Sequence, residues 1–321
     1  MIARNSRFAI GLGVSLWLLL VGCSGSGMPQ QSTLPATASI GAAKNAREIL
    51  YVLVNTGTTT SYVALYDAYA KHPRVIGKIT DGLQNPGALW LDGQGNIYVG
   101  SDMTYTSSVT EYARATLKLV RTYNDGIDLP FGGTIDQKGT MYVSDGGIRG
   151  QIEGAIAVIP PGKRKPSKFL SSNIYVPHGI AKDPAGNLFV AQIYGLASSV
   201  VEFRAGSKTS KVLPLNDLDN GAFLEDLKLD SHNDIVVADA NLNAVRFYPP
   251  PYKKQSTELT AGLFAPTALA YGSDGSLFVG NEYVNANNGN VVVFPPGASA
   301  PARTIVTGID GGVLGVAIGP R

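Results

Sequence analysis

One histidine and a few oxygen-bearing side chains of this chain have the types and spacing that chemistry requires. His178 and Glu225 occupy the same place in two successive copies of a repeated segment. A histidine held beside a carboxylate can serve as a general acid or base near neutral pH. Glu225 also belongs to a set with Asp226, Asp239 and Asn281, whose oxygens suit a hard cation such as Ca²⁺. The sequence therefore predicts two candidate catalytic residues, His178 and Glu225, and a candidate metal site formed by Glu225, Asp226, Asp239 and Asn281.

A third role is open for the same residue types. Asp and Asn often cap tight turns, because their side chains accept hydrogen bonds from nearby backbone amides. Asp145 and Asp239 each follow an apolar strand, where such a turn is expected. Turn capping, cation binding and catalysis thus compete for these carboxylates.

The elements that would position these residues are repeats of roughly 45 residues. Each copy has an apolar strand, a tight turn and a second apolar strand, as in residues 177–183 followed by 186–190. The turn residues of five copies are 42 to 47 positions apart: Gly95, Gly139, Gly186, Asn233 and Gly275. Asn233 fits this series because asparagine tolerates the positive φ that such a turn requires.

Each copy continues with a third and a fourth strand, and four strands at this period are typical of a β-propeller blade. A sixth copy begins at Val313 and stops at Arg321 before its second strand, and residues 49–54 have the missing pattern. We therefore expect an all-β fold over residues 47–321: a six-bladed β-propeller of four-stranded blades, with the last blade closed by the N-terminal strand.

The repeat register predicts two rings of side chains at one mouth of the central channel. The first ring consists of the residue after the strand-opening position, and the second lies six residues after each turn residue. The first ring is Gly87, Phe131, His178, Glu225, Thr267 and Leu314; the second is Ser101, Asp145, Gln192, Asp239, Asn281 and Val54. Polar residues, Glu282 among them, concentrate on the second to fifth copies, so we expect an acidic side and a bland side.

The pattern Pro-x-Gly-Ile-Ala-x-Asp-x-x-Gly-Asn-Leu-Phe-Val, read at residues 177–190, resembles the NHL repeat. It is also similar to related six-bladed groups, the gluconolactonase-like lactonases and the streptogramin lyases. The resemblance covers the whole predicted domain and implies its architecture more strongly than an activity, since propellers host many functions.

The resemblance also bears on the candidate site. His178, between Pro177 and Gly179, resembles the Pro-His-Gly element of the lyases, in which histidine is a general base. The lyases have a second histidine, for which this sequence shows no counterpart at the mouth. The lactonases bind a divalent metal through Glu, Asn and Asp, but His178 stands where their Asn is expected and no glutamate opens the first blade. These departures favour a non-catalytic binding module over a metal-dependent lactonase or a lyase.

The N-terminal segment resembles the signal peptide of a bacterial lipoprotein. Arg4 and Arg7 precede a short apolar stretch at residues 8–22, and the sequence Leu-Val-Gly-Cys ends at Cys23, the chain's only cysteine. The resemblance implies lipidation of Cys23, with a flexible tether over residues 23–46 rich in Ser, Gly, Ala, Thr and Pro. Ser24, as a residue other than Asp, favours the outer membrane of a Gram-negative cell.

The balance of charges limits the function classes. The formal net charge of +2 gives no electrostatic reason to expect a nucleic-acid partner, and a single cysteine excludes an internal disulfide framework. We therefore expect a cell-envelope propeller anchored to the membrane by lipid, which binds a protein, peptide or glycan at its mouth. A divalent cation such as Ca²⁺ is the one cofactor considered, and the alternative function is a lactonase or lyase acting at His178 and Glu225.

Overall fold

The computed structural model describes residues 48–57, 60–102, 107–147, 153–195, 197–218, 221–285 and 288–321. Cys23 and the predicted signal peptide and tether lie outside these residues. All regular elements in the described ranges are β-strands, and none of these residues forms a helix long and apolar enough to cross a membrane.

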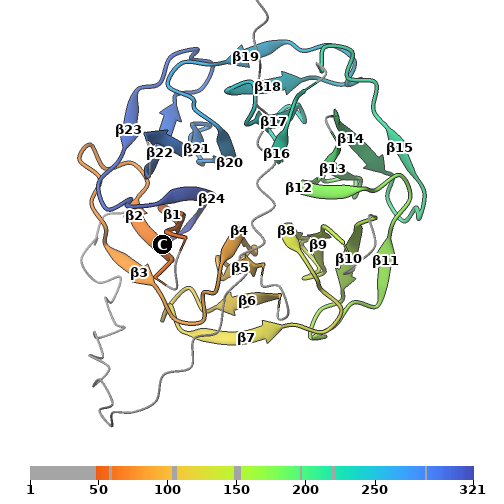
Figure 1. The fold of residues 1–321 in the computed structure, drawn as a ribbon, viewed down its shortest axis with the longest axis horizontal. Helices are drawn as coiled ribbons and strands as arrows, with labels where there is room; N and C mark the ends of the chain where they lie inside the picture. The colour runs from red at the N-terminus through yellow and green to blue at the C-terminus, as the bar shows by residue number, and fades with distance from the viewer. Residues whose placement is uncertain are drawn as a thin grey trace, which may run out of the picture. The chain divides into compact units, whose positions relative to one another are not determined.

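The strands form six four-stranded antiparallel sheets, which are the blades of a propeller (Figure 1). From the innermost to the outermost strand, blade 1 is β4 (Pro86–Leu91), β5 (Ile97–Ser101), β6 (Ser108–Tyr112) and β7 (Leu119–Tyr123); blade 2 is β8 (Pro130–Ile135), β9 (Met141–Asp145), β10 (Ala155–Ile159) and β11 (Lys168–Leu170); blade 3 is β12 (Val176–Lys182), β13 (Leu188–Tyr194), β14 (Ala197–Phe203) and β15 (Ser210–Val212). Blade 4 is β16 (Leu224–Leu229), β17 (Ile235–Asp239), β18 (Ala244–Tyr248) and β19 (Thr257–Leu259); blade 5 is β20 (Pro266–Tyr271), β21 (Leu277–Asn285), β22 (Asn288–Phe294) and β23 (Arg303–Ile305); blade 6 is β24 (Gly312–Pro320), β1 (Glu48–Asn55), β2 (Tyr62–Asp67) and β3 (Gly77–Ile79).

The blades close into a ring through their innermost strands. Each of β4, β8, β12, β16, β20 and β24 contacts the innermost strand of the next blade, and β24 contacts β4 to complete the circle. Within blade 6 the C-terminal strand β24 pairs antiparallel with the N-terminal strand β1, from Glu48↔Pro320 to Asn55↔Gly312. The predicted six-bladed fold and its closure by the N-terminal strand are confirmed.

The turn between the first and second strands of each repeat also follows the prediction. Gly95, Gly139, Gly186, Asn233 and Gly275 all have positive φ, between 62° and 92°. In each of these turns an aspartate accepts a hydrogen bond from a nearby backbone amide; the Oδ1 of Asp92, for example, accepts from the amides of Gln94 and Asn96 at 2.9 and 2.8 Å. These turns lie at one end of the ring. The innermost strands begin at the other end, which we call the mouth.

The core lies between the faces of neighbouring blades. Trp90 and Tyr98 of blade 1, for example, pack with Met141 and Val143 of blade 2 in one buried cluster. Gly133 on β8 leaves the space that the Trp90 ring occupies, because a Cβ there would overlap the indole. Face-to-face packing of this kind fixes each blade relative to the next and so fixes the innermost strands around the central channel.

Candidate binding site at the mouth of the ring

A β-bulge at the start of every innermost strand positions the first ring of side chains. The pairing register shifts between Pro86 and Ala88 in blade 1, and equivalent shifts occur at the mouth end of the other five blades. A bulge leaves one residue unpaired and re-aims its side chain. The unpaired residues include every member of the predicted first ring: Gly87, Phe131, His178, Glu225, Thr267 and Leu314.

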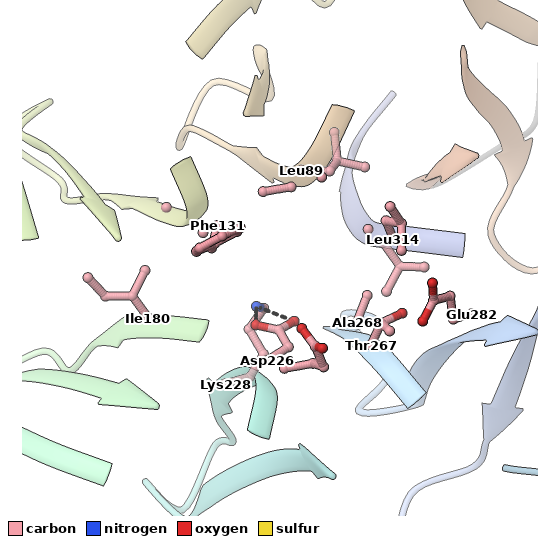
Figure 2. Close-up of a pocket in the computed structure, with 16 residues that line it drawn as sticks. Leu89, Phe131, Ile180, Asp226, Lys228, Thr267, Ala268, Glu282 and Leu314 are labelled. Carbon is pink, nitrogen blue, oxygen red and sulfur yellow. Dashed lines mark hydrogen bonds and ion pairs between the residues drawn. The ribbon is translucent and has the colours of Figure 1, made fainter. Parts of the chain in front are cut away.

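The first ring surrounds a cavity of about 140 Å³ at the centre of the mouth (Figure 2). Five of its six members line this cavity directly: Gly87, Phe131, Glu225, Thr267 and Leu314. The charged lining residues are Glu225, Asp226 and Lys228 of blade 4 and Glu282 of blade 5, whereas Leu89 and Leu314 belong to blades 1 and 6. The bland side on blades 1 and 6 is present, but the acidic side is narrower than expected, because the charged lining comes from blades 4 and 5 and not from blades 2 and 3.

His178 lies beside this cavity and is held from three directions. Its Nδ1 is 3.0 Å from Oε2 of Glu225, and only 9% of the residue is exposed. The imidazole stacks on the ring of Phe131, with centroids 4.8 Å apart, and meets the ring of Phe223 edge-on at 6.0 Å. The structure therefore brings the two predicted catalytic residues into contact and fixes the orientation of the imidazole.

Asp226 is engaged by groups of the protein itself. Its carboxylate accepts hydrogen bonds from Nζ of Lys228 at 2.6 and 2.7 Å. It also accepts the backbone amides of Leu227 at 2.7 Å and of Leu269, on the next innermost strand, at 2.8 Å. Asp226 thus links blades 4 and 5 and neutralises the Lys228 charge.

Glu282 is the carboxylate of the cavity that lacks a positive partner among the residues described. Burial raises the pKa of its carboxyl group; a hydrogen bond with Tyr283 opposes this, and the negative charge of Glu225 raises the pKa further. The two glutamates therefore share one electrostatic environment without a cation between them.

The second predicted ring does not face the mouth. Ser101, Asp145, Gln192, Asp239 and Asn281 are at most 3% exposed, and none of them lines the central cavity. Except for Ser101, whose buried hydroxyl has no hydrogen-bond partner among the described residues, they accept hydrogen bonds from backbone amides that precede the innermost strand of the same blade. Asp145 accepts from Leu129 at 2.9 Å, Gln192 from Tyr175 at 2.9 Å and Asn281 from Phe264 at 3.0 Å. The expectation that these side chains face the channel was wrong, because they turn along the blade to satisfy loop amides that would otherwise be buried unpaired.

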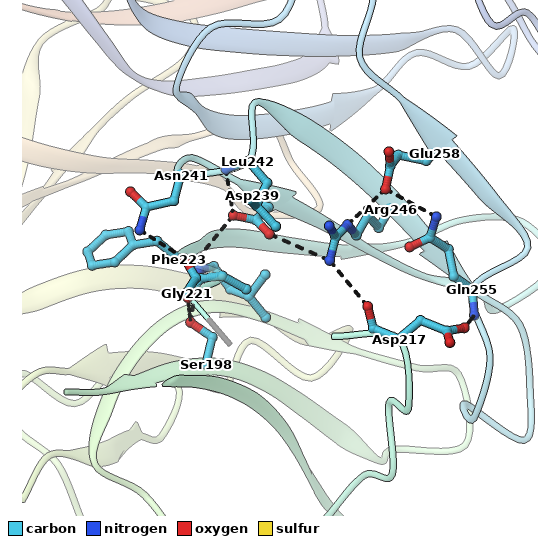
Figure 3. A network of polar contacts seen from close by, with 12 residues as sticks. Ser198, Asp217, Gly221, Phe223, Asp239, Asn241, Leu242, Arg246, Gln255 and Glu258 are labelled. Atoms are coloured by element: carbon cyan, nitrogen blue, oxygen red, sulfur yellow. Dashed lines mark hydrogen bonds and ion pairs between the residues drawn. The ribbon is translucent and has the colours of Figure 1, made fainter. Parts of the chain in front are cut away.

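Asp239 shows the same arrangement with a buried ion pair added (Figure 3). Its Oδ1 accepts hydrogen bonds from the amides of Phe223 at 3.0 Å and Leu242 at 3.2 Å. Its Oδ2 lies 3.8 Å from the guanidinium of Arg246, which also binds Glu258 at 3.1 Å. Burial is the largest single influence and lowers the pKa of Arg246, but the charge of Asp239, together with Tyr248 and Glu258, raises it, so the net shift is upward and the guanidinium stays charged.

The four residues predicted to bind a cation are therefore held in separate sets of contacts. Glu225 binds His178, Asp226 binds Lys228, Asp239 lies against Arg246, and Asn281 donates to Asn290 at 2.8 Å. In the part of the chain that the structure describes, no three His, Cys, Asp or Glu side chains are grouped so as to hold a metal ion. Cation binding by Glu225, Asp226, Asp239 and Asn281 stays a prediction.

Exposed apolar side chains, most of them aromatic, lie at the mouth end of blades 3 to 5, and the repeat pattern did not indicate them. Among the described residues, ten large hydrophobic side chains are exposed, and five of them lie in mouth loops or strand ends of blades 3 to 5: Tyr175, Tyr194, Leu242, Phe264 and Tyr283. Tyr175 and Tyr194 contact each other with ring centroids 4.3 Å apart. The other five, Leu119, Val120, Phe169, Val212 and Val306, lie on or beside outermost strands. We call the first five residues the mouth patch.

Comparison with known proteins bears on the fold. No family profile and no curated protein matches the chain. A structure of a nidogen/laminin complex is similar, with a TM-score of 0.67 and 17% identity over 84% of this chain and 97% of that chain. A Bacteroides caccae protein of unknown function has a TM-score of 0.62 and 13% identity, with 85% and 98% of the two chains covered. Kuenenia stuttgartiensis hydrazine synthase has a TM-score of 0.56 and 18% identity, with coverage of 80% and 83%. At these identities the likeness shows a shared six-bladed propeller fold.

Proposed function

We propose that this chain is a cell-envelope propeller, anchored by lipid on Cys23, that binds a protein partner through the mouth of blades 3 to 5. The observation that carries the proposal is the mouth patch, whose exposed side chains, four of them aromatic, lie at the same end of the ring as the carboxylate-lined cavity. Aromatic residues are enriched in protein interfaces, and contiguous exposed apolar surface marks interaction sites. The similar nidogen propeller comes from a structure of a complex with laminin, which supports a protein partner for this fold.

Site-specific photocrosslinking can test the proposed surface. A photoreactive phenylalanine analogue would replace Tyr194, which is 57% exposed in the mouth patch, and in a second protein would replace Val306, which is 58% exposed beside an outermost strand. Because the two positions are equally accessible, a difference in their crosslinking yields shows which surface the partner contacts and does not reflect a difference in exposure. We expect discrete crosslinked products in intact cells from position 194 and not from position 306. Equal yields from both positions would contradict the proposal.

The lipid anchor is supported by the signal-like segment and its single cysteine. We propose that the NHL-like propeller is exported and anchored in the bacterial envelope through the Leu-Val-Gly-Cys sequence that ends at Cys23, with Ser24 directing it to the outer membrane. Metabolic labelling with a palmitate analogue should mark the wild-type protein and not Cys23→Ser. A Cys23→Ser protein that remains labelled and membrane-bound would overturn the anchor.

A second candidate function is supported by the His178–Glu225 contact. A carboxylate at 3.0 Å from Nδ1 fixes the tautomer of the imidazole, which leaves Nε2 to accept a proton from a bound substrate. This arrangement suits acid–base chemistry of the lactonase or lyase class that the resemblance implies. Phe131 and Phe223 would hold the ring while a substrate occupies the central cavity.

This candidate is tested by assaying lactone opening and macrolactone elimination with wild-type protein and with His178→Ala and Glu225→Gln. If the dyad is catalytic, turnover should fall by at least about a hundredfold in His178→Ala. Glu225→Gln should mainly lower kcat, because it disturbs orientation and not binding. Absence of wild-type turnover across both substrate classes would leave the binding proposal alone.

A further inference from the structure

We infer that the partner bound at the mouth places a lysine or arginine side chain in the central cavity, against Glu225 and Glu282. The inference rests on the proposed function, because it names the chemistry by which the mouth of blades 3 to 5 would recognise its partner. It specifies a basic residue with apolar neighbours, which a partner polypeptide can supply.

The balance of charge in the cavity carries the first step. Its lining includes three carboxylates, Glu225, Asp226 and Glu282, and one ammonium group, Lys228. The Lys228 ammonium lies 2.6 Å from Asp226, so this pair adds little net charge. Two glutamates remain, and the one neighbouring base, His178, contacts Glu225. A neutral imidazole leaves both negative charges uncompensated, and a protonated one leaves one.

The surroundings of Glu282 agree with this balance of charge. The pKa of its carboxyl group is raised by burial and by the charge of Glu225, as expected where two carboxylates share a site without a cation. An incoming ammonium or guanidinium group would reverse both effects by supplying the opposite charge. An anionic partner group would meet two carboxylates in a partly dehydrated space and would be repelled.

The shape of the cavity suits one side-chain head and its aliphatic stem. A volume of about 140 Å³ corresponds to a few water molecules, each of which takes up about 30 Å³ of liquid. Leu89 and Phe131 line it across from the carboxylates of blades 4 and 5, and Leu314 lies beside Glu282 (Figure 2). Lysine and arginine bury their methylene stems against such walls and keep the charged head beside acceptors.

The mouth patch supplies the rest of the interface. Tyr283 of the patch directly follows Glu282 of the cavity in β21. Beside the cavity, Phe131 stacks on His178, and His178 contacts the ring of Phe223 edge-on. Apolar contacts at the rim exclude water from a central charged anchor, which strengthens its interaction with the glutamates. A free small amine would use the cavity but not the rim, so the combination favours a polypeptide.

Matched peptides that differ only in charge test the inference. Full-length protein in detergent would be titrated with acetyl-Leu-Arg-Leu-amide and with the same peptide carrying citrulline, which has the shape of arginine without its charge. We expect the arginine peptide to bind at least tenfold more tightly. Glu282→Gln and Glu225→Gln should each remove most of this difference. Asp274→Asn removes the charge of an exposed carboxylate in the turn between β20 and β21, at the end of the ring opposite the mouth, and should leave the difference unchanged, which separates a local contact from overall charge.

The outcomes separate this inference from the proposed function. Equal binding of the two peptides, or a preference that survives Glu282→Gln and Glu225→Gln, overturns the basic anchor. Saturable binding of Ca²⁺ alone to the cavity, with no preference between the peptides, overturns it as well. Crosslinking at position 194 does not depend on the cavity charge, so specific products there would keep the mouth as a protein-binding surface even if the anchor fails.

Discussion

Replacing Asp239 by alanine should destabilise the propeller, because this carboxylate serves several buried groups at once. It is fully buried, accepts the amides of Phe223 and Leu242, and lies 3.8 Å from the buried Arg246. Alanine would leave two amides unpaired and a guanidinium with one carboxylate fewer. We expect the free energy of unfolding to fall by about 2–4 kcal/mol in urea titrations.

Two controls define the cause of that loss. Asp239→Asn keeps an acceptor for the amides and removes the charge, so its cost should be smaller. Asp125→Ala removes a carboxylate that is 68% exposed and 3.7 Å from Lys165, and should have no measurable effect. A cost of Asp239→Ala no greater than that of Asp125→Ala would contradict the structural role.

Glu282 should make stability depend on pH in a defined direction. Its pKa is raised in the folded state by burial and by Glu225, so the folded protein binds this proton more tightly than the unfolded chain. The stabilisation is complete below the ordinary pKa of a glutamate and is lost as the pH rises through the higher folded value. Glu282→Gln should therefore be more stable than wild type at pH 7, by less than about 1 kcal/mol because part of the group remains solvated. The difference between the two proteins should vanish below about pH 4; a constant difference from pH 4 to 8 would contradict it.

At the scale of single residues, the sequence could identify candidate site residues but not the direction in which their side chains point. His178 and Glu225 were paired correctly because their equivalent places in two repeats put them on neighbouring strands. Asp239 and Asn281 occupy equally regular places, yet their side chains turn back to loop amides, and only the path of the loop decides this. The mouth patch lies in loops and at strand ends, beyond the part of the repeat with a regular pattern, so Tyr175 and Tyr194 could not be assigned to a surface.

At the scale of the strand, the bulges carry the site, and glycines beside them set how closely the innermost strands approach. A Cβ on Gly179 would overlap the backbone of Asp226 and Leu227 on the next innermost strand. Gly87, a bulged glycine in blade 1, has nothing within 4 Å of the same position. These two residues form a matched pair for mutation.

Gly179→Ala should cost at least about 3 kcal/mol of unfolding free energy, because two backbone segments must separate to admit one methyl group. It should also weaken the contact between His178 and Glu225, since they lie on the two strands that move apart. Gly87→Ala should stay within about 0.5 kcal/mol of wild type. Equal midpoints for the two variants in urea would show that the strand contact does not determine the stability of the ring.

The strands themselves were predictable because the turn residue repeats at a nearly constant interval. Positive φ at Asn233 and at four glycines was expected from residue type alone, and the structure has it. The bulge was not expected, because proline followed by any residue and glycine specifies a strand start but no pairing register. The repeat alone was therefore enough to predict which residues form the first ring. The bulge that directs their side chains inward could be recognised only from the pairing of the strands in the structure.

At the scale of the molecule, stability depends on how the ring is closed. β1 contributes Ile49, Leu50, Tyr51, Val52, Leu53 and Val54, all fully buried, and pairs with β24 on one side and β2 on the other. An outermost strand is much weaker: β11 pairs with β10 at three positions, and of its residues only Leu170 is buried. The location of the chain ends should therefore determine how firmly the ring holds together.

Circular permutation can measure this dependence. Glu48 and Pro320 lie opposite each other, so a copy of the turn at residues 92–96 can join β24 to β1 as in the other blades. New ends between Gln94 and Gly95 leave blade 1 closed by an innermost and a second strand, as blade 6 is now, and the midpoint of unfolding should stay close to that of the parent domain.

New ends between Gly162 and Lys163 leave blade 2 held by β11 alone, where burial of Leu170 contributes only about 1.5–3 kcal/mol. This second permutant should unfold at lower urea, and the amides of β11 should exchange first. Equal midpoints for the two permutants would mean that contacts between blade faces, and not the closing strand pair, hold the ring together.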